Sequence, residues 1–200
     1  MGFDDLRWVP SLHRLLVPAG GTGRLDLVDP GSGAVDSIPG LSVAPPGKGH
    51  GAGTTSADFG AGLLFASDRT ARTVVAIDPA SRRIRFRAPL GGSPDYVRWV
   101  EPRREVWVTE PDREVIEIFR LGAEGRLERA GTVRVPGGPE SLVIDPGRGR
   151  AYANTWHGET LAVGLASRSI EARWANGCRG SRGIALDAGR GLVFVGCEEG

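Results

Sequence analysis

The sequence predicts an all-β protein, a β-propeller built from four-stranded antiparallel blades. Two observations carry this prediction: a repeat of about 45 residues runs through the chain, and each repeat holds four short apolar strands separated by turns. A third is negative, since no stretch shows the spacing of apolar residues that an amphipathic helix requires.

The repeat is clearest in the second strand of each unit. Successive central residues of this strand are 49, 42, 45 and 42 positions apart: Leu16, Phe65, Trp107, Tyr152 and Phe194. The long first interval contains the glycine- and proline-rich insertion 45–51. In addition, Arg7-Trp8-Val9 recurs as Arg98-Trp99-Val100 at twice the period.

Turns and links complete each unit. Asp-Pro turns at 29–33 and 78–81 separate the third and fourth strands, because proline presets φ and small residues permit the reversal. Glycine-rich links at 91–94, 137–139 and 177–180 precede the later units. We therefore expect one domain over 1–200, an incomplete propeller with repeat units at 5–40, 51–94, 95–139, 140–181 and, in part, 182–200.

The recurring pattern resembles the YVTN-type β-propeller repeat of the WD40-like superfamily. Val106–Thr109 and Thr73–Asp78 match it best, and 152–163 follows the same order of residues. The resemblance implies a closed ring of about seven blades. About four and a half blades are then present, so we expect a fragment that lacks sequence after its C-terminus and a strand and signal peptide before its N-terminus. Alternatively, a second copy completes the ring.

Aromatic residues recur at equivalent positions of the units. We expect Trp8, Trp99, Trp107 and Tyr152 to pack between blades, because an aromatic side chain buries a large apolar area.

Charge and hydrophobicity limit the partners. The chain has 25 Lys and Arg against 24 Asp and Glu, which leaves a formal net charge of +1. Such a balance gives no basic field for nucleic acid or anionic lipid. Acidic neighbours also offset the turn arginines Arg103, Arg104, Arg148 and Arg150. No apolar run reaches the length of a membrane span, and no signal peptide is visible at the N-terminus.

The order of the strands predicts which loops share a rim. The links between blades and the loops between second and third strands should lie at one end of the propeller, around the mouth of the central channel. The candidate binding residues on this rim are His50, Asp68, Glu110, His157 and Glu159. Imidazole and carboxylate groups could form a metal or acid/base site there, or remain solvated loop residues.

The two cysteines should lie on the same rim. Cys178 is in the link that enters the fifth unit, and Cys197 ends the second strand of that unit. They form either a disulfide or two buried thiols. Because proteins with this repeat are often exported, the resemblance favours an extracytoplasmic location.

Two functions remain open. The sequence favours a non-catalytic binding or scaffold propeller without a cofactor, whose rim loops recognise a small molecule or a partner protein. It contains no Gly-x-Ser-x-Gly, His-Glu-x-x-His or Walker A motif. The alternative is a lactonase-like hydrolase or a lyase with a divalent metal such as Ca²⁺ at the channel mouth, for which Glu110 and Asn154 are the nearest candidates.

Overall fold

The computed structural model describes residues 5–44 and 51–199. Its strands form four four-stranded sheets and one two-stranded sheet, all antiparallel. Within each sheet, strands that follow one another in the sequence are neighbours. This succession confirms the predicted blades: four with all four strands, and a fifth with two.

The first two blades precede and follow the insertion at 45–51. Their strands are, for blade 1, β1 (Arg7–Val9), β2 (Arg14–Pro18), β3 (Thr22–Val28) and β4 (Val35–Val43), and for blade 2, β5 (Ala57–Gly60), β6 (Leu63–Asp68), β7 (Thr73–Asp78) and β8 (Arg83–Pro89).

The remaining blades follow without a gap. Their strands are, for blade 3, β9 (Val97–Val100), β10 (Glu105–Glu110), β11 (Val115–Leu121) and β12 (Leu127–Arg134), for blade 4, β13 (Val143–Asp145), β14 (Arg150–Thr155), β15 (Glu159–Gly164) and β16 (Ile170–Ala175), and for blade 5, β17 (Ser181–Asp187) and β18 (Leu192–Cys197). Four single 3₁₀ turns join strands at Pro10–Leu12, Glu101–Arg103, Pro111–Arg113 and Ala123–Gly125.

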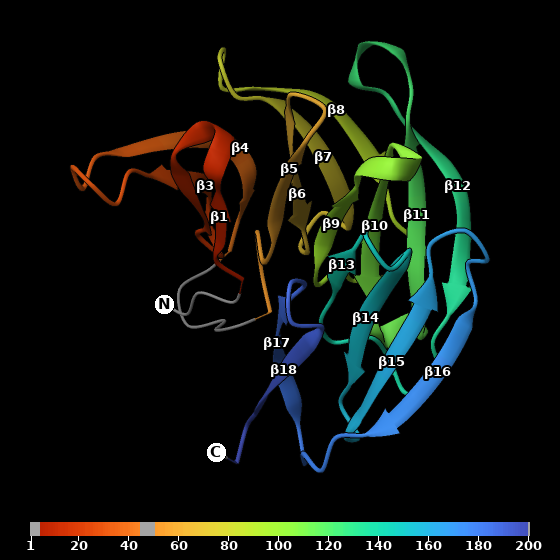
Figure 1. Ribbon diagram of the computed structural model, residues 1–200. Coiled ribbons are helices and arrows are strands. Elements are labelled where there is room, and N and C mark those ends of the chain that lie inside the picture. Colours follow the sequence, from red (N-terminus) through yellow and green to blue (C-terminus); the bar gives the residue numbers. More distant parts are fainter. Residues whose placement is uncertain (1–4, 45–50, 200) are drawn as a thin grey trace.

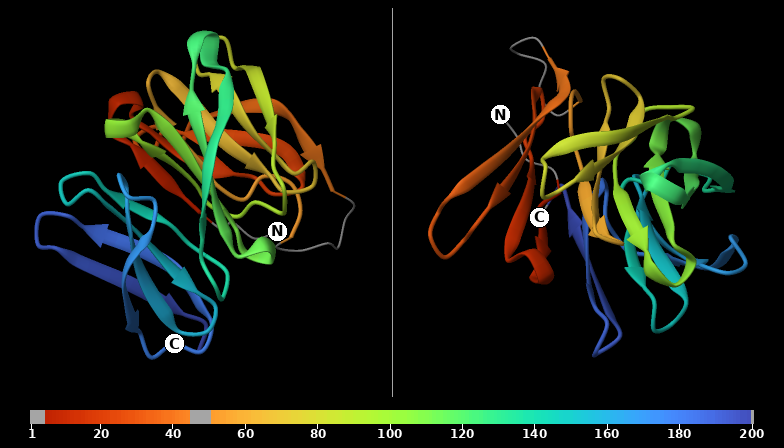
Figure 2. Two further views of the ribbon diagram at one scale, coloured as in Figure 1. Left: turned by 90° about the vertical axis from the view of Figure 1, so that its right-hand side faces the viewer. Right: turned by 90° about the horizontal axis from the view of Figure 1, so that it is seen from above.

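The blades are arranged along an arc (Figure 1). The first strands β1, β5, β9, β13 and β17 lie on its inner side, and β12 and β16 lie on its outer side. The arc is open between blade 1 and blade 5. Views from two other directions show the paired strands of blade 5, in dark blue, beside blade 4 (Figure 2).

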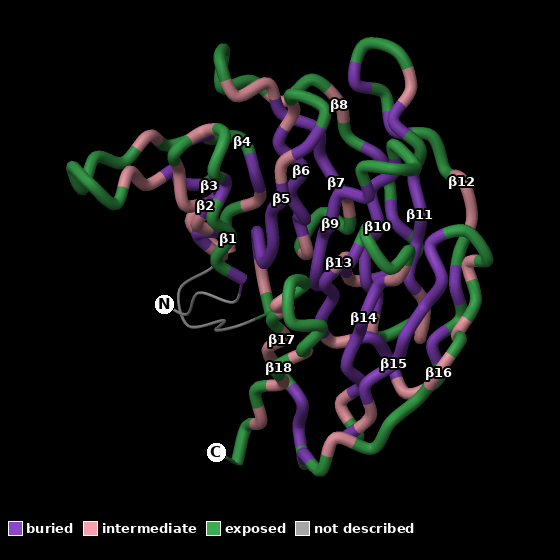
Figure 3. The backbone as a smooth tube through the Cα atoms, in the orientation of Figure 1, coloured by how far each residue is buried: buried purple, intermediate pink, exposed green. Residues whose placement is uncertain are grey.

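The core consists of the layers between blades. Along each second strand, side chains alternate between the two faces of the blade. The central residues Leu16, Phe65, Trp107 and Tyr152 each belong to a buried cluster shared with the following blade. Burial is accordingly concentrated in the inner strands, while turns and outer strands are exposed (Figure 3).

The layer between blades 2 and 3 shows how an aromatic residue fits this geometry. The Trp99 ring stacks on the Phe65 ring, with centroids 5.4 Å apart and planes 10° apart. Trp99 also covers Gly60, where an added Cβ would lie only 2.1 Å from the indole. Glycine at position 60 is therefore required by the close approach of the ring.

The prediction that recurring aromatic residues pack between blades is correct for Trp99, Trp107 and Tyr152 and wrong for Trp8. Trp8 occupies the position of Trp99 in blade 1, yet 43% of it is exposed. Its ring contact is with His13, at 6.1 Å between centroids. The reason is that this position faces away from blade 2, toward the side of blade 1 where the described residues place no neighbouring blade.

We predict that Phe65→Ala lowers the free energy of unfolding by about 3–5 kcal/mol, because it empties a filled layer. Phe194 occupies the same position in β18 but is 55% exposed, so Phe194→Ala should cost less than about 1 kcal/mol. Urea unfolding of both variants measures the difference. Equal losses would contradict the assignment of these two faces.

Candidate functional site

The links between blades and the loops between second and third strands meet at one end of the blades, which we call the link rim. The Ser93 N–H donates to the Asp112 carboxylate at 3.1 Å, and isolated bridges pair Gly20 with Thr54 and Pro139 with Thr155. Each link between blades thus lies against a loop or strand end of a neighbouring segment. The sequence predicts that the candidate binding residues lie on this rim.

Asp68 and Glu110 are held inside the structure. Both are buried at the ends of second strands. The Asp68 carboxylate accepts the N–H of Ser42 at 2.8 Å and of Ala71 at 3.1 Å, so it fastens blade 2 to the end of β4 in blade 1. Glu110 accepts from the Arg113 guanidinium at 3.1 Å. The Asp68 carboxylate thus has a structural role, whereas in Glu110 only Oε2 is paired and the buried Oε1 has no hydrogen-bond partner among the described residues.

Glu159 and His157 belong to blade 4, whereas Asp68 belongs to blade 2 and Glu110 to blade 3. Glu159 pairs with Arg173 on the neighbouring strand β16 at 2.9 Å. His157 is exposed in the loop between β14 and β15, and His50 lies outside the described residues. Over residues 5–44 and 51–199, no group of three or more His, Cys, Asp or Glu side chains is placed to hold a metal ion.

His157 contributes to a cavity on the link rim between blades 4 and 5. This rim cavity has a volume of about 350 Å³ and is open to solvent. Its walls are formed by Trp156, His157, Cys178, Arg179, Gly180 and Glu198. The volume is in the range of small-molecule sites.

A disulfide forms part of the wall. The structure joins Cys178 to Cys197 with Cα atoms 5.3 Å apart, so the link before blade 5 is bonded to the end of β18. A two-stranded sheet is marginally stable by itself. Closing a loop of this length stabilises the folded state by roughly 3 kcal/mol, which helps to hold blade 5 against blade 4.

Backbone contacts around the disulfide fix the shape of the cavity. The Gly180 N–H donates to the Trp156 carbonyl at 3.2 Å, and the Glu198 N–H donates to the Gly180 carbonyl at 2.9 Å. At Gly158, a Cβ would lie 2.3 Å from the Cys178 carbonyl oxygen. The cavity is therefore preorganised by backbone, since these contacts leave its loops little room to move.

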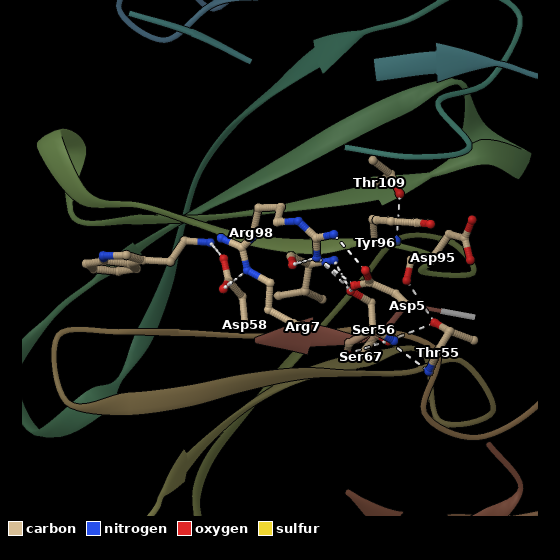
Figure 4. Close-up of polar contacts among 12 residues, drawn as sticks. Asp5, Arg7, Thr55, Ser56, Asp58, Ser67, Asp95, Tyr96, Arg98 and Thr109 are labelled. Atoms are coloured by element: carbon tan, nitrogen blue, oxygen red, sulfur yellow. Dashed lines mark hydrogen bonds and ion pairs between the residues drawn. The ribbon is translucent and has the colours of Figure 1, made fainter. Parts of the chain in front are cut away.

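Apart from the rim cavity, a cluster of buried polar residues lies at the inner strands (Figure 4). Arg98 on β9 makes two parallel hydrogen bonds to the Asp5 carboxylate, at 2.6 and 2.8 Å. Ser56 donates to Asp5 at 2.5 Å and accepts the Val97 N–H at 2.9 Å. Asp5, Ser56 and Arg98 are at most 8% exposed, so this cluster ties three blades together at the centre.

The buried charge of Arg98 is compensated by this arrangement. Burial alone would lower the pKa of its guanidinium, but the Asp5 carboxylate outweighs burial and raises it above the ordinary value. Beside this pair, Asp58 accepts the Trp99 N–H at 2.9 Å and pairs with Arg7 at 3.1 Å. The charges at the centre are thus paired within the protein.

Glu140 is a partly buried acid shortly before β13, at the start of the fourth unit. The backbone N–H of Glu140 donates to the backbone carbonyl of Asn154. The backbone N–H of Asp95 donates in the same way to the carbonyl of Thr109, so the two acids occupy equivalent positions at the start of their units. Burial raises the pKa of the Glu140 carboxyl, and the positive charges of Arg182 and Arg69 partly offset this effect. Burial is therefore the main influence on the protonation of the Glu140 carboxyl.

Sequence reasoning missed the central cluster and Glu140. The repeat of Arg7-Trp8-Val9 as Arg98-Trp99-Val100 contained the signal for the first, since its arginines recur with its tryptophans. The acid that follows proline in both Pro94-Asp95 and Pro139-Glu140 was the signal for the second.

Comparison with solved structures decides the fold. Hydrazine synthase of Kuenenia stuttgartiensis superposes with a TM-score of 0.75 at 13% identity, over 90% of this chain and 51% of that one. The chain has the β-propeller fold. The β-propeller domain of Myceliophteria thermophila Cps50 (Swd1) gives 0.75 at 11%, over 98% and 62%, and a chain of the Mitotic Checkpoint Complex gives 0.77 at 11%, over 98% and 56%.

This propeller chain spans between half and two thirds of the length of these structures. No family model and no curated protein matches the sequence, so the resemblance to YVTN-type repeats stays a prediction. In the part of the chain that the structure describes, no helix has the length and apolar character needed to cross a membrane.

Proposed function

We propose that this propeller is a binding module without catalysis, and that it holds its partner at the rim cavity between blades 4 and 5. The observation that carries the proposal is a contrast among the candidate residues: some are held by contacts within the protein, and others are exposed at the cavity. Asp68, Glu110 and Glu159 are engaged by backbone or arginine, whereas His157 and Arg179 in the cavity wall are exposed to solvent.

A protein is the partner that the comparisons favour. The Mitotic Checkpoint Complex is by its name an assembly of proteins, and its propeller-like chain shares the fold described above. A rim fixed by backbone contacts and a disulfide suits such a role, because preorganised surfaces lose less entropy on binding. The disulfide also supports an extracytoplasmic location, since such bonds persist in oxidising compartments.

We further propose that blades 1 and 5 contact additional blades, supplied by the same polypeptide or by a second copy. Trp8 and Phe194, 43% and 55% exposed, occupy the positions that form the stacked pair Trp99 and Phe65 between blades 2 and 3. Among the described strands, β18 pairs with β17 alone. An unpaired strand edge and an uncovered apolar face both favour further association.

The binding proposal predicts a local response to small probes. In two-dimensional NMR of the full chain with neutral, cationic and anionic fragments, shifts should cluster at 156–158, 177–180 and 198. Trp156→Ala should weaken binding about tenfold, as loss of an aromatic anchor does. The matched variant is Trp174→Ala, because Trp174 is an exposed tryptophan on outer strand β16. Absence of rim shifts with every fragment, or Ca²⁺-dependent turnover of a lactone, would contradict the proposal.

The ring proposal predicts the behaviour of the purified chain by light scattering. A mass of twice the 21.1 kDa of one chain identifies a second copy, and Phe194→Ala should weaken that dimer. A monomer that binds a hydrophobic dye, less so after Trp8→Ala, indicates blades from the same polypeptide. A stable monomer that binds no dye contradicts both versions.

A further inference from the structure

In the rim cavity, the acceptor side chains have hydrogen-bond partners within the described part of the protein and the donor side chains do not. Its acceptors are engaged: the Glu198 carboxylate lies 3.5 Å from the Arg182 guanidinium, and Glu199 beside the cavity accepts the Arg179 backbone N–H. This bond is the main reason that the pKa of the Glu199 carboxyl is lowered, and the charge of Arg179 contributes to the same effect. The Glu199 carboxyl is therefore in its acceptor form at neutral pH, and protein donors already lie beside both acids.

The donors of the same cavity remain available. Within the described ranges, the Trp156 indole N–H, the His157 ring and the Arg179 guanidinium make no hydrogen bond, and none of the three has an ion-pair partner within 4 Å, although the charge of Arg179 acts on the Glu199 carboxylate from a greater distance. An indole is a donor only, a guanidinium is a donor only, and an imidazole can donate from either nitrogen. A ligand that satisfies this wall must bring acceptor oxygens.

The remaining wall is apolar and fixed. One face of Trp156 is covered by Arg182, whose guanidinium carbon lies 3.9 Å from the ring centroid. The disulfide and Gly180 complete the wall. Gly180 has a φ of +90°, a backbone conformation that residues with a side chain rarely adopt. A short aliphatic stem fits such a surface, while a bulky charged group does not gain from it.

We infer that the rim cavity binds a carboxylate on a short apolar stem, with Arg179 as its main partner and Trp156 and His157 as further donors. The inference rests on the proposed rim-binding function and names its ligand class. A carboxylate accepts two hydrogen bonds from one guanidinium, and such charge-assisted bonds are about twice as strong as neutral ones. The source is either an aspartate or glutamate side chain of a protein or a free small carboxylate.

The experiment compares matched probes by NMR titration of the full chain. N-acetyl-glutamate N-methylamide should shift the Trp156 indole N–H and the amides of Arg179 and Gly180, and its glutamine analogue should bind at least tenfold more weakly. Arg179→Gln should weaken binding of the glutamate probe at least tenfold. The control is Arg173→Gln, because Arg173 is also partly exposed in this region but pairs with Glu159 at 2.9 Å. It should change the affinity less than twofold.

Two further probes identify the source. If a peptide with two glutamates binds more tightly than the single-glutamate probe, the ligand class is an acidic protein segment. If acetate binds as tightly as the glutamate probe, it is a free carboxylate.

Equal binding of the glutamate and glutamine probes, or equal effects of the two arginine variants, would overturn the inference. Binding of neutral or cationic fragments alone would overturn it too, while leaving the proposed rim function intact. No binding of any probe would defeat both.

Discussion

The buried ion pair between Asp5 and Arg98 is the contact on which the arrangement of the first three blades depends. Asp5 precedes β1, Arg98 lies on β9, and Ser56 of the segment before β5 bonds to both. A charge buried in the core is costly unless its partner is in place, so removing one member leaves the other uncompensated. The pair thus penalises any displacement of blade 1 relative to blade 3, which the apolar layers alone would resist only weakly because hydrophobic contact is not directional.

Away from this centre, equivalent aromatic positions are packed between some blades and exposed at the two ends of the arc. Between blades 2 and 3, the positions of Trp99 and Phe65 are filled, and at the two ends the equivalent Trp8 and Phe194 are exposed. Blade 5 contacts blade 4 through a small cluster, and the disulfide adds a covalent tie. The rim cavity lies at this lightly packed junction, where backbone contacts and the disulfide, and not a large apolar cluster, fix the loops that form its wall.

The fold was predictable because period and strand patterning act locally: each unit must bury two faces, and its alternation reveals them. The site was less predictable. Asp68 and Glu110 have the chemistry of ligands, but only the structure shows the backbone N–H groups and the arginine that engage them. The partnership of Asp5 with Arg98 spans 93 residues, and no local pattern encodes such a pairing. The exposure of Trp8 depends on what lies beside blade 1, which its own residues do not specify.

The most direct test of the central pair is a double-mutant cycle on Asp5→Asn and Arg98→Met, measured by urea unfolding. Each single change should cost about 3–5 kcal/mol, because it leaves a buried polar partner unsatisfied. The double change should cost clearly less than the sum, with a coupling of about 2–3 kcal/mol. Arg7→Gln is the control, since Arg7 is nearly half exposed, and it should cost about 1 kcal/mol or less. Additive losses at Asp5 and Arg98, or losses no larger than that of Arg7→Gln, would contradict the claim that this pair holds the three blades in place.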